Sequence, residues 1–115
     1  MVSTTVTTSA QYFTAWAIKA DDGFTSVVLN NRNDSSGVNA TVNLGAAVSG
    51  ASAIYLQGTP AGSLTVPATS VTLAGAQITP AGVWTRNPPY IQTTSGNTVS
   101  VYVPPTSAAL VRVLQ

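Results

Sequence analysis

The sequence consists of short runs in which apolar and polar side chains alternate with a period of two. In the cleanest run, residues 38–44, the apolar members are Val38, Ala40, Val42 and Leu44, and the polar members are Asn39, Thr41 and Asn43. Successive side chains of a strand point to opposite faces, so this spacing predicts a strand with one face in a core and the other in water. No stretch of useful length shows the 3.6-residue period of a helix. The chain is therefore expected to fold as β-structure.

Turn-forming residues separate these runs at regular intervals. Asp22 and Gly23 form an Asp-Gly pair typical of a tight hairpin. The expected strands cover residues 11–19, 24–31, 38–44, 51–58, 64–66, 71–73, 76–78, 82–86, 98–103 and 107–114, and the last is continuous enough to be central. Residues 87–90 contain two prolines and predict an irregular connection. About eight to ten short strands predict an antiparallel β-sandwich of two sheets, with a closed barrel as the alternative.

The length of 115 residues fits one domain with one core. Residues 1–10 are rich in threonine and serine and are expected to be a linker or an edge strand, whereas residues 11–115 form the sandwich. The opening Met1 before this stretch suggests an excised module of a larger protein. Cysteine is absent, which excludes disulfides and thiolate chemistry.

Parity along two runs predicts which side chains are exposed. In residues 51–58, Ile54 and Leu56 share one face, which is expected to be core, and this places Tyr55 and Gln57 on the opposite, exposed face. In residues 11–19, the favoured interpretation puts Trp16 outside and the face of Phe13, Ala15 and Ala17 inside. The alternative is a core tryptophan. Tyr102 is out of phase with its valine neighbours and is also expected to be exposed.

Composition excludes several functions. Charged residues make up 6% of the chain and the formal net charge is +1, with the four basic residues scattered, so we expect no nucleic-acid partner. No apolar run approaches the roughly 20 residues that span a bilayer, so we expect no membrane partner.

The acidic residues are Asp21, Asp22 and Asp34 alone, and the chain has no histidine, so the usual acid–base pairs of hydrolases are missing. We expect no enzymatic activity and no cofactor. The aspartates are expected to form turns, with Ca²⁺ ligation as the alternative.

The runs at residues 24–29, 38–44, 71–76, 80–84 and 103–111 together resemble the small C-terminal β-sandwich domains of bacterial glycoside hydrolases. Within that group, the chain is similar to the carbohydrate-binding module of family 81, which is appended to an endoglucanase and directed at β-glucans. The resemblance implies a secreted, extracellular, noncatalytic module that is covalently attached to a glycoside hydrolase.

In that family a planar platform of aromatic residues holds a cello-oligosaccharide, so the resemblance implies that Trp16, Tyr55 and Trp84 bind β-1,4 or mixed-linkage β-glucan. Aromatic rings can stack on the C–H face of a pyranose. The polar and flanking candidates are Gln57, Asn30, Asn31, Arg86, Tyr90 and Tyr102, of which the polar ones would pair with sugar hydroxyls.

Two interpretations compete with sugar binding. In the first, the chain is a structural sandwich that packs on a catalytic domain, and its exposed aromatic residues belong to that interface. In the second, it is an adhesin-like or capsid-like scaffold, which fits the composition but explains no particular aromatic residue. Coplanar rings would favour glucan binding, whereas rings nested among aliphatic side chains would favour an interface.

Overall fold

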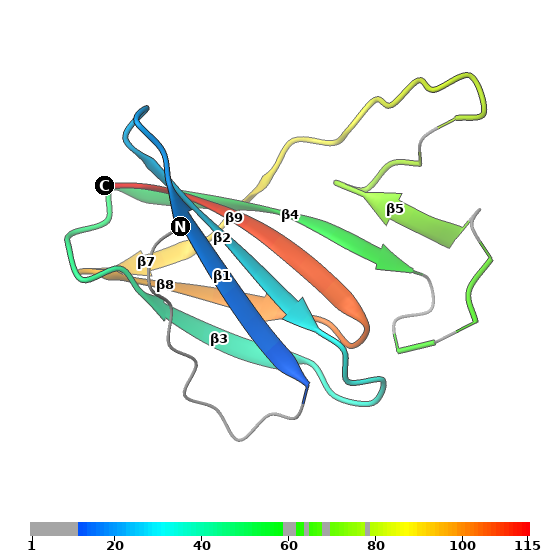
Figure 1. Ribbon diagram of the computed structural model, residues 1–115, viewed down its shortest axis with the longest axis horizontal. Coiled ribbons are helices and arrows are strands. Elements are labelled where there is room, and N and C mark those ends of the chain that lie inside the picture. Colours follow the sequence, from blue (N-terminus) through cyan, green and yellow to red (C-terminus); the bar gives the residue numbers. More distant parts are fainter. Residues whose placement is uncertain (1–11, 59–61, 64, 68–69, 78) are drawn as a thin grey trace.

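The computed structural model describes residues 12–58, 62–63, 65–67, 70–77 and 79–115. Within these ranges the chain forms nine strands and no α-helix (Figure 1). The strands are β1 (Phe13–Lys19), β2 (Phe24–Asn31), β3 (Val38–Asn43), β4 (Gly50–Gly58), β5 (Val71–Leu73), β6 (Tyr90–Ile91), β7 (Thr93–Ser95), β8 (Thr98–Val103) and β9 (Ser107–Leu114). The all-β prediction is confirmed, and a search of the described residues finds no helix that could cross a membrane.

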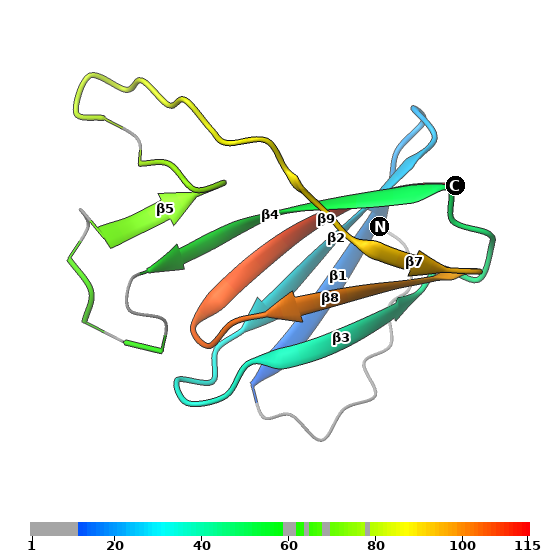
Figure 2. The same ribbon diagram turned by 180° about the vertical axis from the view of Figure 1, so that it is seen from behind.

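The strands form two antiparallel sheets that face each other, as Figures 1 and 2 show from opposite sides. The larger sheet has the order β1-β2-β9-β4-β5, with β6 pairing to another part of β4, and the smaller has the order β3-β8-β7. The Asp-Gly turn joins β1 to β2 as predicted, and β9 lies centrally between β2 and β4. The predicted sandwich of two sheets is therefore confirmed.

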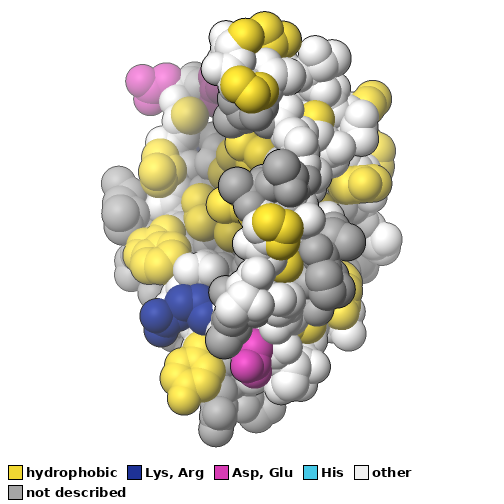
Figure 3. Space-filling view, turned by 90° about the vertical axis from the view of Figure 1, so that its right-hand side faces the viewer, with side chains coloured by type: hydrophobic (Ala, Val, Ile, Leu, Met, Phe, Trp, Pro, Cys, Tyr) yellow, Lys and Arg dark blue, Asp and Glu magenta, His cyan; other side chains and the backbone are white. Residues whose placement is uncertain are grey.

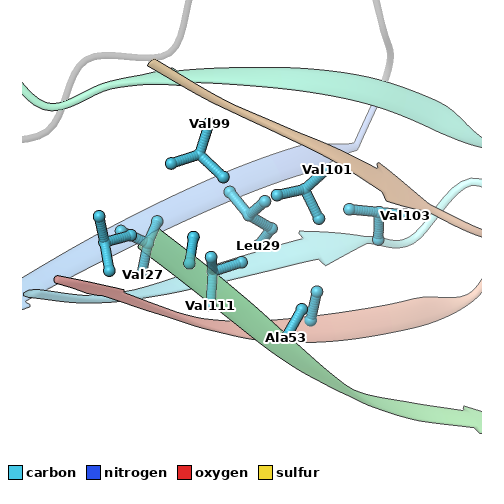
Figure 4. Packing of buried hydrophobic residues seen from close by; sticks show 10 residues of the cluster. Val27, Leu29, Ala53, Val99, Val101, Val103 and Val111 are labelled. Atoms are coloured by element: carbon cyan, nitrogen blue, oxygen red, sulfur yellow. The ribbon is translucent and has the colours of Figure 1, made fainter. Parts of the chain in front are cut away.

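The core lies between the two sheets and consists mainly of valines. Val99, Val101 and Val103 of β8 point from the smaller sheet toward Leu29 of β2 and Val111 of β9 in the larger one (Figure 4). These five side chains are almost fully buried. Because β-branched side chains suit strands and are stiff, they fill a thin, flat core with little loss of rotamer freedom.

The inward face of β1 is the predicted one, since Phe13, Ala15 and Ala17 pack against the core. The predicted faces of β4 are wrong. Ala51 and Ala53 are buried in the core and Tyr55 packs against it, whereas Leu56 is exposed on the outside.

The segment between β4 and β8 also differs from prediction. The run predicted at residues 82–86 belongs to no named strand. Neither do residues 65–66 and 76–77, the described parts of the runs predicted at 64–66 and 76–78. Residues 64 and 78 lie outside the described ranges. The predicted linker at residues 1–10 also lies outside them. β6 and β7 were not predicted, because runs of two or three residues carry no clear alternation. Of the connection predicted at residues 87–90, residues 87–89 are irregular as predicted, whereas Tyr90 begins β6.

Candidate functional site

The larger sheet carries a row of apolar side chains across its outer face, the face turned away from the smaller sheet. Trp16 of β1 lies opposite Val28 of β2, Val28 opposite Leu110 of β9, and Leu110 opposite Ile54 of β4. Directly opposed side chains of antiparallel strands are about 5 Å apart, so these four residues are neighbours and form what we call the apolar band. Trp16 is 44% exposed and Leu110 is 39% exposed.

Further exposed apolar side chains lie on the same outer face. They are Ile18, Leu56, Ile91 and Leu114. One ion pair interrupts them: Arg112 of β9 lies 3.0 Å from Asp22 and stacks 4.0 Å above the ring of Phe24. A solvent-facing sheet face is usually polar, so an outer face of this composition points to a covering partner.

The structure does not bring the three predicted platform residues together. Trp16 is exposed on the outer face, as predicted, but it stands among aliphatic side chains. Tyr55 lies on the opposite, inner face of the same sheet and packs against the core, so the prediction that it is exposed by parity is wrong. Trp16 and Tyr55 are therefore on opposite faces of the larger sheet.

Tyr55 forms a local cluster with two other predicted tyrosines. Its hydroxyl donates to the carbonyl oxygen of Tyr102 on β8 at 2.8 Å, and its ring centroid is 5.9 Å from that of Tyr90 on β6. Burial, with a smaller contribution from Tyr90, raises the pKa of the Tyr55 phenol. The ring of Tyr102 is exposed, as predicted, and lies over Gly37. This tyrosine cluster bridges the two sheets.

Trp84 and Arg86 lie in the connection between β5 and β6. The Trp84 indole N–H donates to the carbonyl oxygen of Leu73 at 3.0 Å, which fastens this connection to β5, and the side chain is half-buried. Arg86 is exposed. Neither residue lines the hollow described next or belongs to the apolar band.

Three of the predicted polar residues do meet, at one end of the larger sheet. Asn30 and Asn31 of β2 and Gln57 of β4 line a hollow of about 360 Å³, which we call the end hollow. The rest of its lining comprises Arg32, Leu56, Gly58, Ser63, Val66, Val71, Thr106, Ser107 and Ala108. Asn30, Ala108 and Leu56 form the row next to the apolar band, so the end hollow adjoins the band.

Asn31 is fully buried, and its side-chain amide is used by the protein itself. The amide nitrogen donates to the carbonyl oxygens of Ser36, Val103 and Pro104, at 2.9, 3.2 and 3.2 Å. The amide oxygen accepts the backbone N–H of Asn33. Asn31 therefore ties β2 to the turn after β8, and direct contact with a sugar is not expected of it.

The three aspartates do not converge. Asp21 and Asp22 lie in the turn before β2 and Asp34 lies beyond its far end, roughly 25 Å away at the rise of a strand. Asp22 caps the hairpin by accepting the Phe24 N–H and pairs with Arg112. Among the described residues no three acidic, histidine or cysteine side chains are grouped for a metal ion. The turn role of Asp22 is thus observed.

Val28, Leu110 and Arg32 were not among the predicted site residues. Val28 and Leu110 are apolar members of strands whose inner face is also apolar, so alternation gave no sign that they stand in a row. The pairing register revealed that row. The signal available in the sequence was the central strand at residues 107–114, which carries Leu110 and Leu114 on the same parity as its charged residue, Arg112.

The same fold occurs in parts of two glycoside hydrolase structures. One is CelM2, a bifunctional glucanase-xylanase from a metagenome library, with a TM-score of 0.56, 20% identity, and coverage of 89% of this chain and 16% of that chain. The other is the GH51 arabinofuranosidase from Xanthomonas axonopodis pv. citri, with a TM-score of 0.59, 19% identity, and coverage of 88% of this chain and 18% of that chain. At this identity the likeness establishes the fold.

No family model matches the chain, and a search among curated proteins gives no match. The resemblance to family 81 therefore stays a prediction. The chain spans 16–18% of the length of the two hydrolase chains, so its fold is that of a minor part of each.

Proposed function

We propose that this chain is a noncatalytic accessory β-sandwich of a secreted glycoside hydrolase, and that the outer face of its larger sheet packs against the catalytic domain. The apolar band is the observation that carries the proposal. Its four residues come from four adjacent strands and form a continuous surface without a charge. Exposing such an apolar surface to water is unfavourable in free energy, and docking against another domain removes the surface from water.

A catalytic domain is the occupant that best fits the other observations. The matched part is only 16–18% of each of the two hydrolases, so in each of them the sandwich shares the polypeptide with a much larger part. The chain itself has three carboxylates, of which Asp22 is engaged with Arg112, and it offers no acid–base pair of its own. Catalysis would then belong to the attached domain.

Binding of β-glucan is the second candidate, and one observation favours it. Trp16 presents an exposed indole on a flat sheet face, where a pyranose ring could stack. Tyr55 and Trp84 give this candidate less support, since one packs on the core and the other fastens a connection. A single stacked ring predicts weak binding of cello-oligosaccharides.

Titration of cellopentaose into the chain, followed by tryptophan fluorescence, separates the two candidates. Glucan binding predicts saturable quenching that is lost in Trp16→Ala. The quenching should persist in Trp84→Phe, which keeps an aromatic ring at that position. Far-UV circular dichroism checks that each variant is folded. The docking proposal predicts no response to cellopentaose or barley β-glucan. Saturable binding that depends on Trp16 would assign the outer face to sugar instead of to a protein.

A further inference from the structure

The end hollow contains two polar side chains that make no hydrogen bond within the described part of the chain. Asn30 and Arg32 line it, and neither side chain makes a hydrogen bond or ion pair with another described residue. Gln57 also lines it, but its side chain has the inner-face parity of Tyr55. The described ion pair of the chain lies elsewhere, between Arg112 and Asp22. Because polar groups in a concave surface favour partners, the side chains of Asn30 and Arg32 are available to a ligand.

Other residues of the end hollow are committed to building it. Asn31 is fully buried and holds the turn after β8, as described above. In that turn Thr106 has a φ of 49°, a left-handed conformation that a β-branched residue rarely adopts. Its hydroxyl accepts the Gly62 N–H at 3.0 Å and donates to the Pro105 carbonyl at 2.8 Å, which holds it there. Such strain persists where the surroundings fix a shape, and it clusters at binding sites.

The rest of the wall of the end hollow is apolar. Leu56, Val66, Val71 and Ala108 contribute aliphatic surface, and Val66 packs closely on Gly58. A volume of about 360 Å³ lies at the small end of the range for ligand pockets, which is roughly 300–1,000 Å³. A combination of an aliphatic wall, the Asn30 amide and limited volume suits one sugar ring, which has both C–H surface and hydroxyls.

Arg32 is the charged side chain among the lining residues. A guanidinium pairs with a carboxylate through two parallel hydrogen bonds, which are stronger than bonds to neutral hydroxyls. We propose that the end hollow binds a single sugar residue that carries a carboxylate, a uronic acid. Arg32 pairs with the carboxylate, and Asn30 bonds a hydroxyl. This binding site adjoins the docking face, with which it shares Leu56, and it requires no attached domain to bind the sugar.

The test is titration of the ¹⁵N-labelled chain with glucuronic acid, glucose and acetate, followed by NMR shifts of the backbone and side-chain amides. Three proteins are compared: the unaltered chain, Arg32→Gln, and Arg86→Gln as a control at an exposed arginine outside the hollow. We expect saturable shifts at Asn30 and Gln57 with glucuronic acid at millimolar concentrations, reduced about tenfold in affinity by Arg32→Gln. Arg86→Gln should bind as the unaltered chain does, and glucose and acetate should each bind about tenfold more weakly.

Each other outcome overturns the proposal. Equal affinity for glucose and glucuronic acid, unchanged in Arg32→Gln, would mean that the carboxylate is not recognised. Equal affinity for acetate and glucuronic acid would mean that Arg32 attracts anions without reading a sugar. Absence of saturable shifts at Asn30 and Gln57 would remove the site altogether. Thermal unfolding of Arg32→Gln should match that of the unaltered chain, because the side chain is exposed.

Discussion

At the scale of single residues, the structure separates side chains that maintain the fold from those that remain free. Asn30 and Asn31 are adjacent in sequence and both line the end hollow, yet Asn31 is 0% exposed and fully hydrogen-bonded, whereas the side chain of Asn30 is half-buried. Both residues were predicted as sugar ligands, because the sequence does not show which of the two amides meets backbone carbonyls. That distinction depends on the end of β8 and the turn after it, which pack against β2. Val103, whose carbonyl oxygen accepts from Asn31, is 72 residues further along the sequence.

Replacing Asn31 by alanine should destabilise the chain by about 3 kcal/mol, because it leaves buried carbonyl oxygens and one N–H without a partner. Asn30→Ala is the matched control and should change stability by less than about 0.5 kcal/mol. Urea unfolding followed by fluorescence measures both. Equal effects of the two substitutions would show that Asn31 does not hold the turn.

Tyr55 should make stability depend on pH in the alkaline range. Burial, and then Tyr90, raise the pKa of its phenol above the ordinary 10.0, so the folded state favours the protonated form. The corresponding stability is fully present below pH 10 and is lost as pH rises through the raised pKa, since the unfolded phenol ionises first. Urea unfolding at a series of pH values should show this fall, and Tyr55→Phe should lessen it. An identical fall in both proteins would contradict the assignment.

At the scale of elements, alternation predicted strands well where the two faces differ clearly in polarity. β3 and β8 have one apolar and one polar parity, so their inward faces were predicted correctly. β4 carries apolar groups on both parities, and the larger residues Ile54 and Leu56 were expected inside. The structure buries the small Ala51 and Ala53 instead, opposite the valines of the smaller sheet. Which apolar face is covered depends on the partner sheet, and a single strand does not encode it.

β9 offers a direct test of the assigned faces, since Val111 and its neighbour Leu110 are 0% and 39% exposed. Val111→Ala should cost about 2 kcal/mol, from lost burial of two methyl groups and the cavity that remains. Leu110→Ala should cost less than about 1 kcal/mol, although leucine is the larger residue. The midpoints of urea unfolding show which variant is less stable. A greater loss of stability in Leu110→Ala than in Val111→Ala would mean that the outer face is covered within the chain itself.

At the scale of the whole molecule, one sheet is larger than the other and both of its faces carry apolar side chains. The smaller sheet covers the inner face (Figure 1). The apolar band lies on the outer one. Figure 3 looks onto the side of the molecule where β5 lies: most of the surface in view is uncharged, and hydrophobic groups are scattered over it. The sequence predicted two sheets. The apolar band could not be predicted, because it depends on the pairing register of four strands, and no local sequence pattern encodes that register.

That the outer face is a protein interface is tested most directly by sedimentation velocity of the isolated chain from micromolar to millimolar concentration. Without its partner, the exposed apolar band should drive self-association, so the average mass should rise above 11.7 kDa with concentration. Leu110→Lys, at the centre of the band, should hold the chain at the monomer mass. Ser100→Lys, which adds the same charge on the exposed side of β8, should associate as the unaltered chain does. A chain that stays monomeric throughout, or one that associates equally with Leu110→Lys, would contradict docking through the outer face.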